Sequence, residues 1–132
     1  MANLSYPLST SGREAVRTAS GRPVSGITLE AVVAGEIGPR DVAVAPETLR
    51  IQAGFAADGG NRQLAENLRR GAELVVFSDD ELLRFYEMLR PGRSSAAELD
   101  SLAETLADRG ATRCAALVRE ARAAYMRRGL IA

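Results

Sequence analysis

The sequence predicts an all-α protein, a small open bundle of about five or six helices that follows an irregular N-terminal arm. Three observations support this fold class. Alanine, the residue with the highest helix propensity, is abundant. Apolar residues recur at helical spacing in the segments that follow residue 46. No apolar run has a convincing partner strand, so the helices must bury one another's apolar faces.

The arm is predicted to cover residues 1–26, and the helical domain is predicted to cover residues 27–132. Glycine and proline recur through the arm together with serine and threonine, and this composition favours irregular backbone. Tyr6, Pro7 and Leu8 form an apolar, aromatic island in these polar surroundings. The island either folds back on its own domain or lies on another chain, and both hypotheses remain open. We therefore take these three residues as candidate partner contacts.

The first helix of the domain is expected at residues 28–34. Thr28 can cap its N-terminus through the side-chain hydroxyl, and Gly35 can take the left-handed backbone conformation that ends many helices. The segment "DVAV" at 41–44 alternates apolar residues, but no neighbouring segment offers it a partner strand. We expect an extended connector there.

The next two helices lie on either side of the "DGGN" break. Pro46 suits the first turn of a helix that runs to Asp58, although Ala45 before it offers no hydroxyl cap. Asn61 can cap the helix that follows the break. Four residues of this second helix should form one apolar stripe: Leu64, Leu68, Ala72 and Val75.

The stretch "FSDDELLRFYEMLRPGRSS" at 77–95 holds two capping boxes. In each box a serine hydroxyl accepts a backbone N–H three residues on, and a glutamate reaches back to the serine N–H. Ser78 pairs with Glu81 in this way, and Ser95 pairs with Glu98. Pro91 ends the first helix, because proline lacks the N–H and disfavours helical backbone before it.

The helix between these signals is expected at residues 79–90. Asp79, Asp80 and Glu81 resemble an acidic site, but carboxylates at a helix N-terminus are explained by the helix dipole. We expect this helix to bury Leu82, Tyr86 and Leu89. The helix at 96–109 should bury Leu99, Leu102, Ala103 and Leu106, and the helix at 111–128 should align Cys114, Val118, Ala121 and Tyr125.

The residues that the chain lacks exclude most catalytic chemistry. Histidine, lysine and tryptophan are absent, and Cys114 is the one cysteine. There is therefore no imidazole base or histidine triad, no lysine for a Schiff base or phosphate loop, and no set of thiolates for zinc. The sequence predicts no catalytic residue, no cofactor-binding residue and no metal ligand.

All 17 basic residues are arginines, and 17 acidic residues balance them. This balance argues against nucleic acid and membrane surfaces as partners. The N-terminus has no signal-peptide pattern and no run reaches the ~18 apolar residues of a membrane span, so we expect a cytoplasmic protein. Arg90 and Arg93 flank the stop at Pro91, where they either contact a partner or tie the corner together.

Several unusual segments occur in one order along the chain: "YPL" at 6–8, "GITLEAVVAGEIGPRDV" at 26–42, "DDELLRFYEMLRPGRSS" at 79–95 and "VREARAAY" at 118–125. Together they resemble the small (gamma) subunit of adenosylcobalamin-dependent diol dehydratase and glycerol dehydratase. The resemblance covers nearly the whole chain. No segment in it is a catalytic motif.

The resemblance implies a role inside a larger bacterial enzyme. In that family a dimer of heterotrimers of large, medium and small subunits converts 1,2-propanediol or glycerol to an aldehyde and water. Adenosylcobalamin is held between the large and medium subunits, and the small subunit supplies no catalytic residue. Some members carry an amphipathic N-terminal extension before the arm, and it is associated with packing into bacterial microcompartments. Because this sequence begins almost at the arm, we expect a cytoplasmic location, and a microcompartment stays open as the alternative. A helical interaction or scaffold protein derived from the family is the alternative hypothesis.

Overall fold

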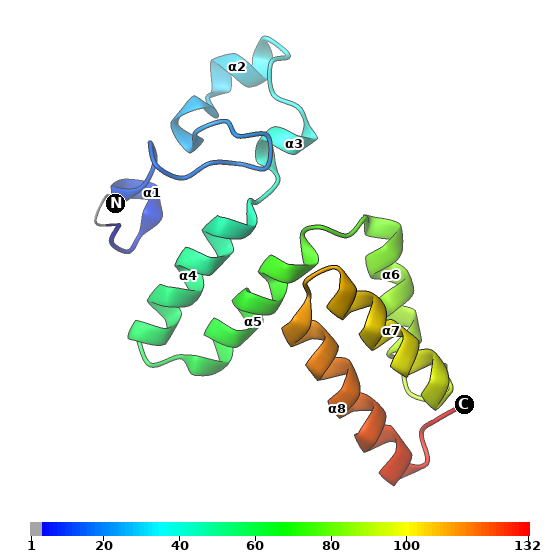
Figure 1. The fold of residues 1–132 in the computed structure, drawn as a ribbon. Helices are drawn as coiled ribbons and strands as arrows, with labels where there is room; N and C mark the ends of the chain where they lie inside the picture. The colour runs from blue at the N-terminus through cyan, green and yellow to red at the C-terminus, as the bar shows by residue number, and fades with distance from the viewer. Residues whose placement is uncertain (1–3) are drawn as a thin grey trace. The chain divides into compact units, whose positions relative to one another are not determined.

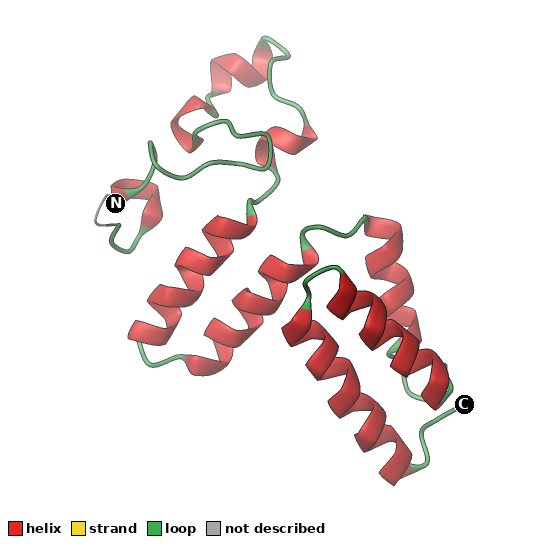
Figure 2. Ribbon diagram, in the orientation of Figure 1, coloured by secondary structure: helices red, strands yellow, loops and turns green. Residues whose placement is uncertain are grey.

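The computed structural model describes residues 4–132, and this part of the chain is helical with no β-strand (Figures 1 and 2). The all-α prediction is confirmed. The described helices comprise the six that were expected and shorter turns in the N-terminal region. In chain order they are α1 (Leu8–Ser11), the 3₁₀ helix η1 (Val24–Gly26), α2 (Leu29–Val33), α3 (Pro39–Val42), α4 (Pro46–Asp58), α5 (Arg62–Leu74), α6 (Asp79–Met88), α7 (Ala96–Asp108) and α8 (Thr112–Arg128).

The chain forms two compact units, Met1–Ala72 and Glu73–Ala132. The two units differ in how they are built. Large apolar side chains fill the core of the C-terminal unit. Among the described residues of the N-terminal unit, the buried apolar residues are one valine and four alanines: Val16, Ala45, Ala53, Ala65 and Ala72. A core of such small side chains removes little apolar surface from water.

Short helices and polar contacts shape the first part of the N-terminal unit. The predicted helix at 28–34 is present as α2, and Thr28 Oγ1 accepts the Ala31 backbone N–H at 3.2 Å. Gly35 follows in the left-handed conformation with φ of 74°. The cap at Thr28 and the glycine at 35 therefore predict the position of this helix correctly, although no residue of α2 is buried.

The "DVAV" segment is not an extended connector over its whole length. Asp41 and Val42 lie in the helical turn α3, and only Val44 is extended, in an isolated antiparallel bridge with Thr18. The partner comes from the arm, 26 residues earlier along the chain. Local sequence could not indicate it, because an isolated bridge has no alternating strand on either side.

Asp41 joins the arm to the α2–α3 region. Its Oδ1 accepts the Ser20 hydroxyl at 2.6 Å, and its Oδ2 accepts the Gly38 backbone N–H at 2.7 Å. Arg22 Nε lies 3.4 Å from the same carboxylate. These hydrogen bonds, the one from Ser20 first, hold the pKa of Asp41 below its usual value.

Helices α4 and α5 begin where the sequence predicts. Pro46 occupies the first turn of α4, and Ala45 before it makes no side-chain cap. Asn61 Oδ1 accepts the Leu64 N–H at 3.1 Å and so caps α5. Along the predicted stripe of α5, Ala72 is buried and Leu68 is partly buried, whereas Leu64 and Val75 at its two ends are exposed.

The C-terminal unit packs α6, α7 and α8 around one apolar core. Figure 1 shows α7 and α8 running side by side as a hairpin. The predicted stripe of α7 is confirmed, and in α8 Cys114 and Val118 are buried while Ala121 and Tyr125 are partly buried. The buried residues of this core are Phe77, Phe85, Leu99, Leu102, Ala103, Leu106, Ala111, Cys114, Ala115 and Val118.

The predicted buried face of α6 is wrong at one position. Phe85 is only 6% exposed and packs edge-to-face on Phe77, with ring centroids 5.3 Å apart. Tyr86 is 69% exposed. Leu82 and Leu89 do pack against the core. Both aromatic residues fit an apolar stripe at helical spacing, and the position of Phe77 decides which ring is buried.

Candidate functional site

The corner after α6 is fixed by backbone contacts to the end of the chain. The Gly92 N–H donates to the Leu130 carbonyl at 2.8 Å, and the Ala132 N–H donates to the Ser94 carbonyl at 2.9 Å. The Tyr125 hydroxyl donates to the Leu89 carbonyl at 2.6 Å. Gly92 has φ of 73°, a left-handed conformation that suits glycine. The segment at 89–95, which is rich in glycine, proline and serine, therefore forms a rigid corner that these hydrogen bonds hold in place.

Both arginines of this corner lie beside the same carboxylate. Arg90 Nη1 is 3.0 Å from Glu87 Oε2, and Arg93 Nε is 3.4 Å from Glu87 Oε1. About half of each arginine side chain is exposed. The ion pairs tie the corner together, as one of the two hypotheses states, and they leave a guanidinium surface open to solvent.

Arg109 closes the other end of this helical unit. Its guanidinium lies 4.1 Å from the centre of the Phe77 ring, and it donates to Glu81 Oε1 and to the Val76 carbonyl, each at 2.6 Å. The sequence interpretation of the arginines favours ion pairs or a protein interface. Arg109 forms an ion pair of this kind with Glu81. Together with the cation–π contact, this ion pair links the start of α6 to the end of α7.

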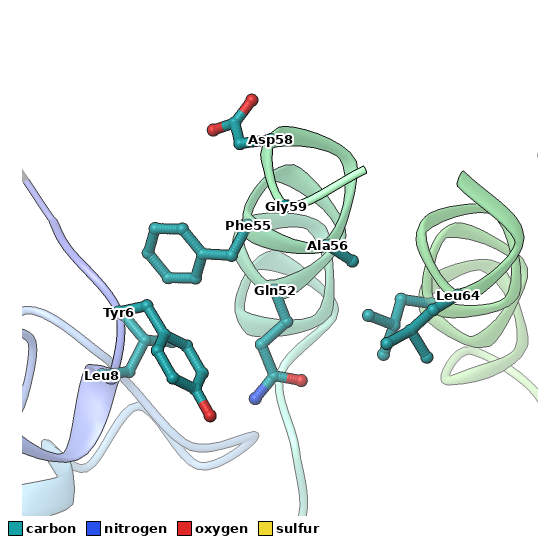
Figure 3. Close-up of a pocket in the computed structure, with 9 residues that line it drawn as sticks. Tyr6, Leu8, Gln52, Phe55, Ala56, Asp58, Gly59 and Leu64 are labelled. Carbon is teal, nitrogen blue, oxygen red and sulfur yellow. The ribbon is translucent and has the colours of Figure 1, made fainter. Parts of the chain in front are cut away.

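The arm forms one wall of an apolar groove in the N-terminal unit. Tyr6 packs edge-to-face on Phe55, with ring centroids 6.2 Å apart, yet it remains 80% exposed. Figure 3 shows Tyr6 and Leu8 from the arm beside α4, with Leu64 reaching across from α5. The groove has a volume of about 650 Å³ and is lined by Tyr6, Leu8, Gln52, Phe55, Ala56, Asp58, Gly59, Leu64 and Leu68.

The hypothesis that the arm folds back describes this arrangement, and the hypothesis that it lies on another chain stays a prediction. The arm folds back on its own unit through Tyr6 and Leu8, and it leaves most of the Tyr6 ring in water. The sequence offered no signal for Phe55 as the partner ring, because 49 residues separate the two aromatics. An exposed aromatic at the rim of an apolar groove is typical of a protein-binding surface.

The groove does not resemble a catalytic centre. Its polar side chains are Gln52 and Asp58, and the Asp58 carboxylate points away from the apolar centre in Figure 3. Within residues 4–132, no three His, Cys, Asp or Glu side chains lie close enough together to hold a metal ion. Cys114 is buried in the core of the other unit.

The comparison with known proteins decides the family. The sequence pattern of one family, the dehydratase small subunit, matches residues 1–132. The chain belongs to this dehydratase small-subunit family. It is 43% identical to the propanediol dehydratase small subunit of Citrobacter freundii and 42% identical to that of Salmonella typhimurium. Both alignments cover 124 residues, which are 93% of this chain and 72% of each relative.

Membership of the dehydratase small-subunit family confirms the resemblance drawn from the sequence motifs. The chain is a subunit of an enzyme, a hydro-lyase complex, and a small subunit implies larger partner subunits. None of the helices in residues 4–132 combines the length and apolar character that crossing a bilayer requires. The functional surface of such a subunit is the one that meets its partners.

Proposed function

We propose that this dehydratase small subunit assembles with large and medium subunits into an adenosylcobalamin-dependent enzyme of the bacterial cytoplasm. The enzyme would convert 1,2-propanediol, or the related glycerol, to the corresponding aldehyde and water. The observation that carries the proposal is the identity of 42–43% to two propanediol dehydratase small subunits over 93% of the chain. A dimer of heterotrimers is the expected assembly.

The role of this chain in the enzyme is structural. The chain has no histidine and no lysine, so it offers neither an imidazole nor an amine for catalysis. The cofactor and the catalytic residues therefore belong to the partner subunits in this proposal. The small subunit contributes surfaces with both apolar and charged side chains. These surfaces support the partner subunits around the active site, from which water must be excluded.

Two surfaces are proposed as partner contacts. One is the arm, through Tyr6, Pro7 and Leu8, because an exposed aromatic ring and an apolar groove lie together there. The other is the rigid corner, through Arg90 and Arg93, whose half-exposed guanidinium groups can donate hydrogen bonds to carboxylates of a partner. A corner held by backbone hydrogen bonds can present these side chains with little loss of conformational freedom.

The test is reconstitution. The chain would be co-expressed with the large and medium dehydratase subunits of its own organism, and the native mass would be measured together with aldehyde formation from 1,2-propanediol and adenosylcobalamin. A complex of three chain types, with activity that needs all three, supports the proposal. A free small protein, beside partners that produce aldehyde equally well without it, would contradict the proposal and favour an independent scaffold protein.

A further inference from the structure

Helix α2 presents its apolar residues to solvent. Leu29, Val32 and Val33 are spaced i, i+3 and i+4, so they share one helix face. They are 73%, 52% and 80% exposed. Ala31 is the one α2 residue that is even partly buried. A helix on the surface of a globular domain normally buries its aliphatic face against the core, whereas α2 exposes that face to solvent.

The position of α2 does not depend on burying these side chains. The helix is held by the Thr28 cap, by the Glu36 N–H that donates to the Ala31 carbonyl at 2.9 Å, and by Arg22, whose Nη2 donates to the Glu36 carbonyl at 3.2 Å. These polar contacts hold the helix while Leu29, Val32 and Val33 stay exposed. No described residue of the N-terminal unit covers most of this aliphatic face, since its three side chains are 52–80% exposed.

Two carboxylates flank this face. Glu30 lies on α2 and Glu36 lies just beyond its end, and both side chains are exposed. Neither makes an ion pair within residues 4–132, since the guanidinium of Arg22 pairs with Asp41 instead. The face is therefore apolar in its centre and acidic at its rim. An anionic membrane or a nucleic acid would be repelled by this rim.

We propose that the face formed by Leu29, Val32 and Val33 docks into an apolar groove with a basic rim on a larger subunit of the dehydratase. Spacing of i, i+3 and i+4 is typical of a helix that binds in a groove. A second copy of this chain is a poorer occupant, because a symmetric contact would bring the Glu30 and Glu36 carboxylates of the two copies together. The inference rests on the proposed function and adds the surface and the chemistry of its partner.

The test compares a double substitution in α2 with a single control substitution in α6, both made in the co-expressed complex. Leu29→Ser with Val33→Ser removes the apolar face, and Leu83→Ser is the matched control, because Leu83 is an aliphatic residue of α6 with a similar exposure of 67%. We expect the α2 variant to lose about tenfold or more in affinity for the larger subunits, measured by titration, while the control keeps the wild-type affinity. Both substituted faces are exposed, so circular dichroism should show unchanged helix content in the free chain.

Charge reversal at the rim gives a second measurement. Glu30→Arg leaves Glu36 as the one carboxylate of the rim, so it should slow association and weaken the salt dependence of binding if the groove on the partner is basic. In hydrogen exchange on the full chain, amides of residues 29–36 should exchange quickly when free and slowly in the complex, because α2 has no buried residue of its own.

The outcomes separate this inference from the proposed function. If the wild-type chain does not assemble at all, the proposed function fails and the inference fails with it. If the wild type assembles and the α2 variant binds equally well, only the inference is overturned. An equal loss in the Leu83→Ser control, or a dimer of the free chain that the α2 variant abolishes, would also overturn it.

Discussion

The backbone N–H of Cys114 donates to the Glu73 carboxylate at 2.9 Å, and the N–H of Arg113 donates to the same carboxylate at 3.1 Å. Helix α8 has Ala111 at its N-cap position, where no side chain can accept a hydrogen bond. A residue about 40 positions earlier thus satisfies two of the four N–H groups that every helix leaves open at its start. This contact joins the end of α5 to the longest helix of the C-terminal unit.

Removing this remote cap should destabilise the chain. We expect Glu73→Ala to lower the free energy of unfolding by about 1–2 kcal/mol, since the loss of a helix cap has effects of this size. The measurement is urea unfolding of the free subunit followed by circular dichroism. Glu104→Ala is the control, because Glu104 is exposed and makes no contact of this kind within the described residues. Equal stability of the two variants would refute the cap.

The contact of Arg109 with Phe77 should stabilise the fold by more than the charge of Arg109 alone does. Arg109→Lys retains a cation but loses the planar fork and most of the stacking on the ring, so we expect a loss of about 0.5–1 kcal/mol in stability. Arg119→Lys on the exposed part of α8 is the matched control and should change little. Thermal unfolding of both variants measures the difference, and an unchanged midpoint for Arg109→Lys would show that charge alone is enough there.

The capping boxes should make the stability depend on acid. Hydrogen bonds from Ser95, first from its backbone N–H and then from its hydroxyl, lower the pKa of Glu98 below its usual 4.5. A carboxyl whose pKa is depressed in the folded state stabilises that state above the unfolded pKa, and the stabilisation is lost as the pH falls through the folded pKa. We expect Glu98→Gln to lower the unfolding temperature at pH 7 and to flatten its decline below pH 4.5. Parallel pH profiles for the variant and the wild type would contradict this account.

The exposed ring of the arm should contribute to assembly. We expect Tyr6→Ala to weaken binding to the larger subunits by about tenfold, because exposed tyrosines next to apolar grooves often become central contacts. Tyr86→Ala serves as the control, since Tyr86 is 69% exposed on α6. Affinity is measured by titration of the purified subunits. If the two variants bind alike, the arm serves only its own unit.

The two arginines of the corner can be tested together. Arg90→Ala with Arg93→Ala removes two exposed ion pairs to Glu87, which should change the stability of the free chain by less than about 1 kcal/mol. If the arginines also contact a partner, the amount of assembled complex should fall much more than stability does. The control is Arg127→Ala with Arg128→Ala, a pair of exposed arginines at the end of α8. Unchanged assembly and activity would leave the corner with a structural role only.

How far the sequence predicts the structure differs between features. The starts of α5, α6 and α7 were predictable, because side-chain caps act over three residues: Ser78 and Ser95, for example, accept the N–H groups of Glu81 and Glu98, as their spacing indicates. The buried stripe of α7 was also predictable from local sequence, because helical periodicity places its leucines on one face.

The candidate surfaces were only partly predictable. Composition indicated an apolar island at Tyr6 in a polar arm, but its contact with Phe55 depends on how the distant helix α4 lies against the arm. The exposure of the aliphatic face of α2 could not be predicted from the sequence, because its residues have the same spacing as those of a buried helix face. Which side of an apolar helix is covered is decided by the neighbours available to cover it.

The sequence by itself determined the helical class, the helix starts, the absence of imidazole and amine chemistry, and the family. These follow from short-range rules and from residue types. Only the tertiary structure decided that Phe85 rather than Tyr86 is buried, that Glu73 caps α8, and that the chain's end bonds to the corner through Leu130 and Ala132. The contacts of Glu73 and of the chain's end join segments about 40 residues apart, and the burial of Phe85 depends on how Phe77 and the other core residues pack around it. The energy of each feature therefore depends on the folded arrangement and not on the local sequence.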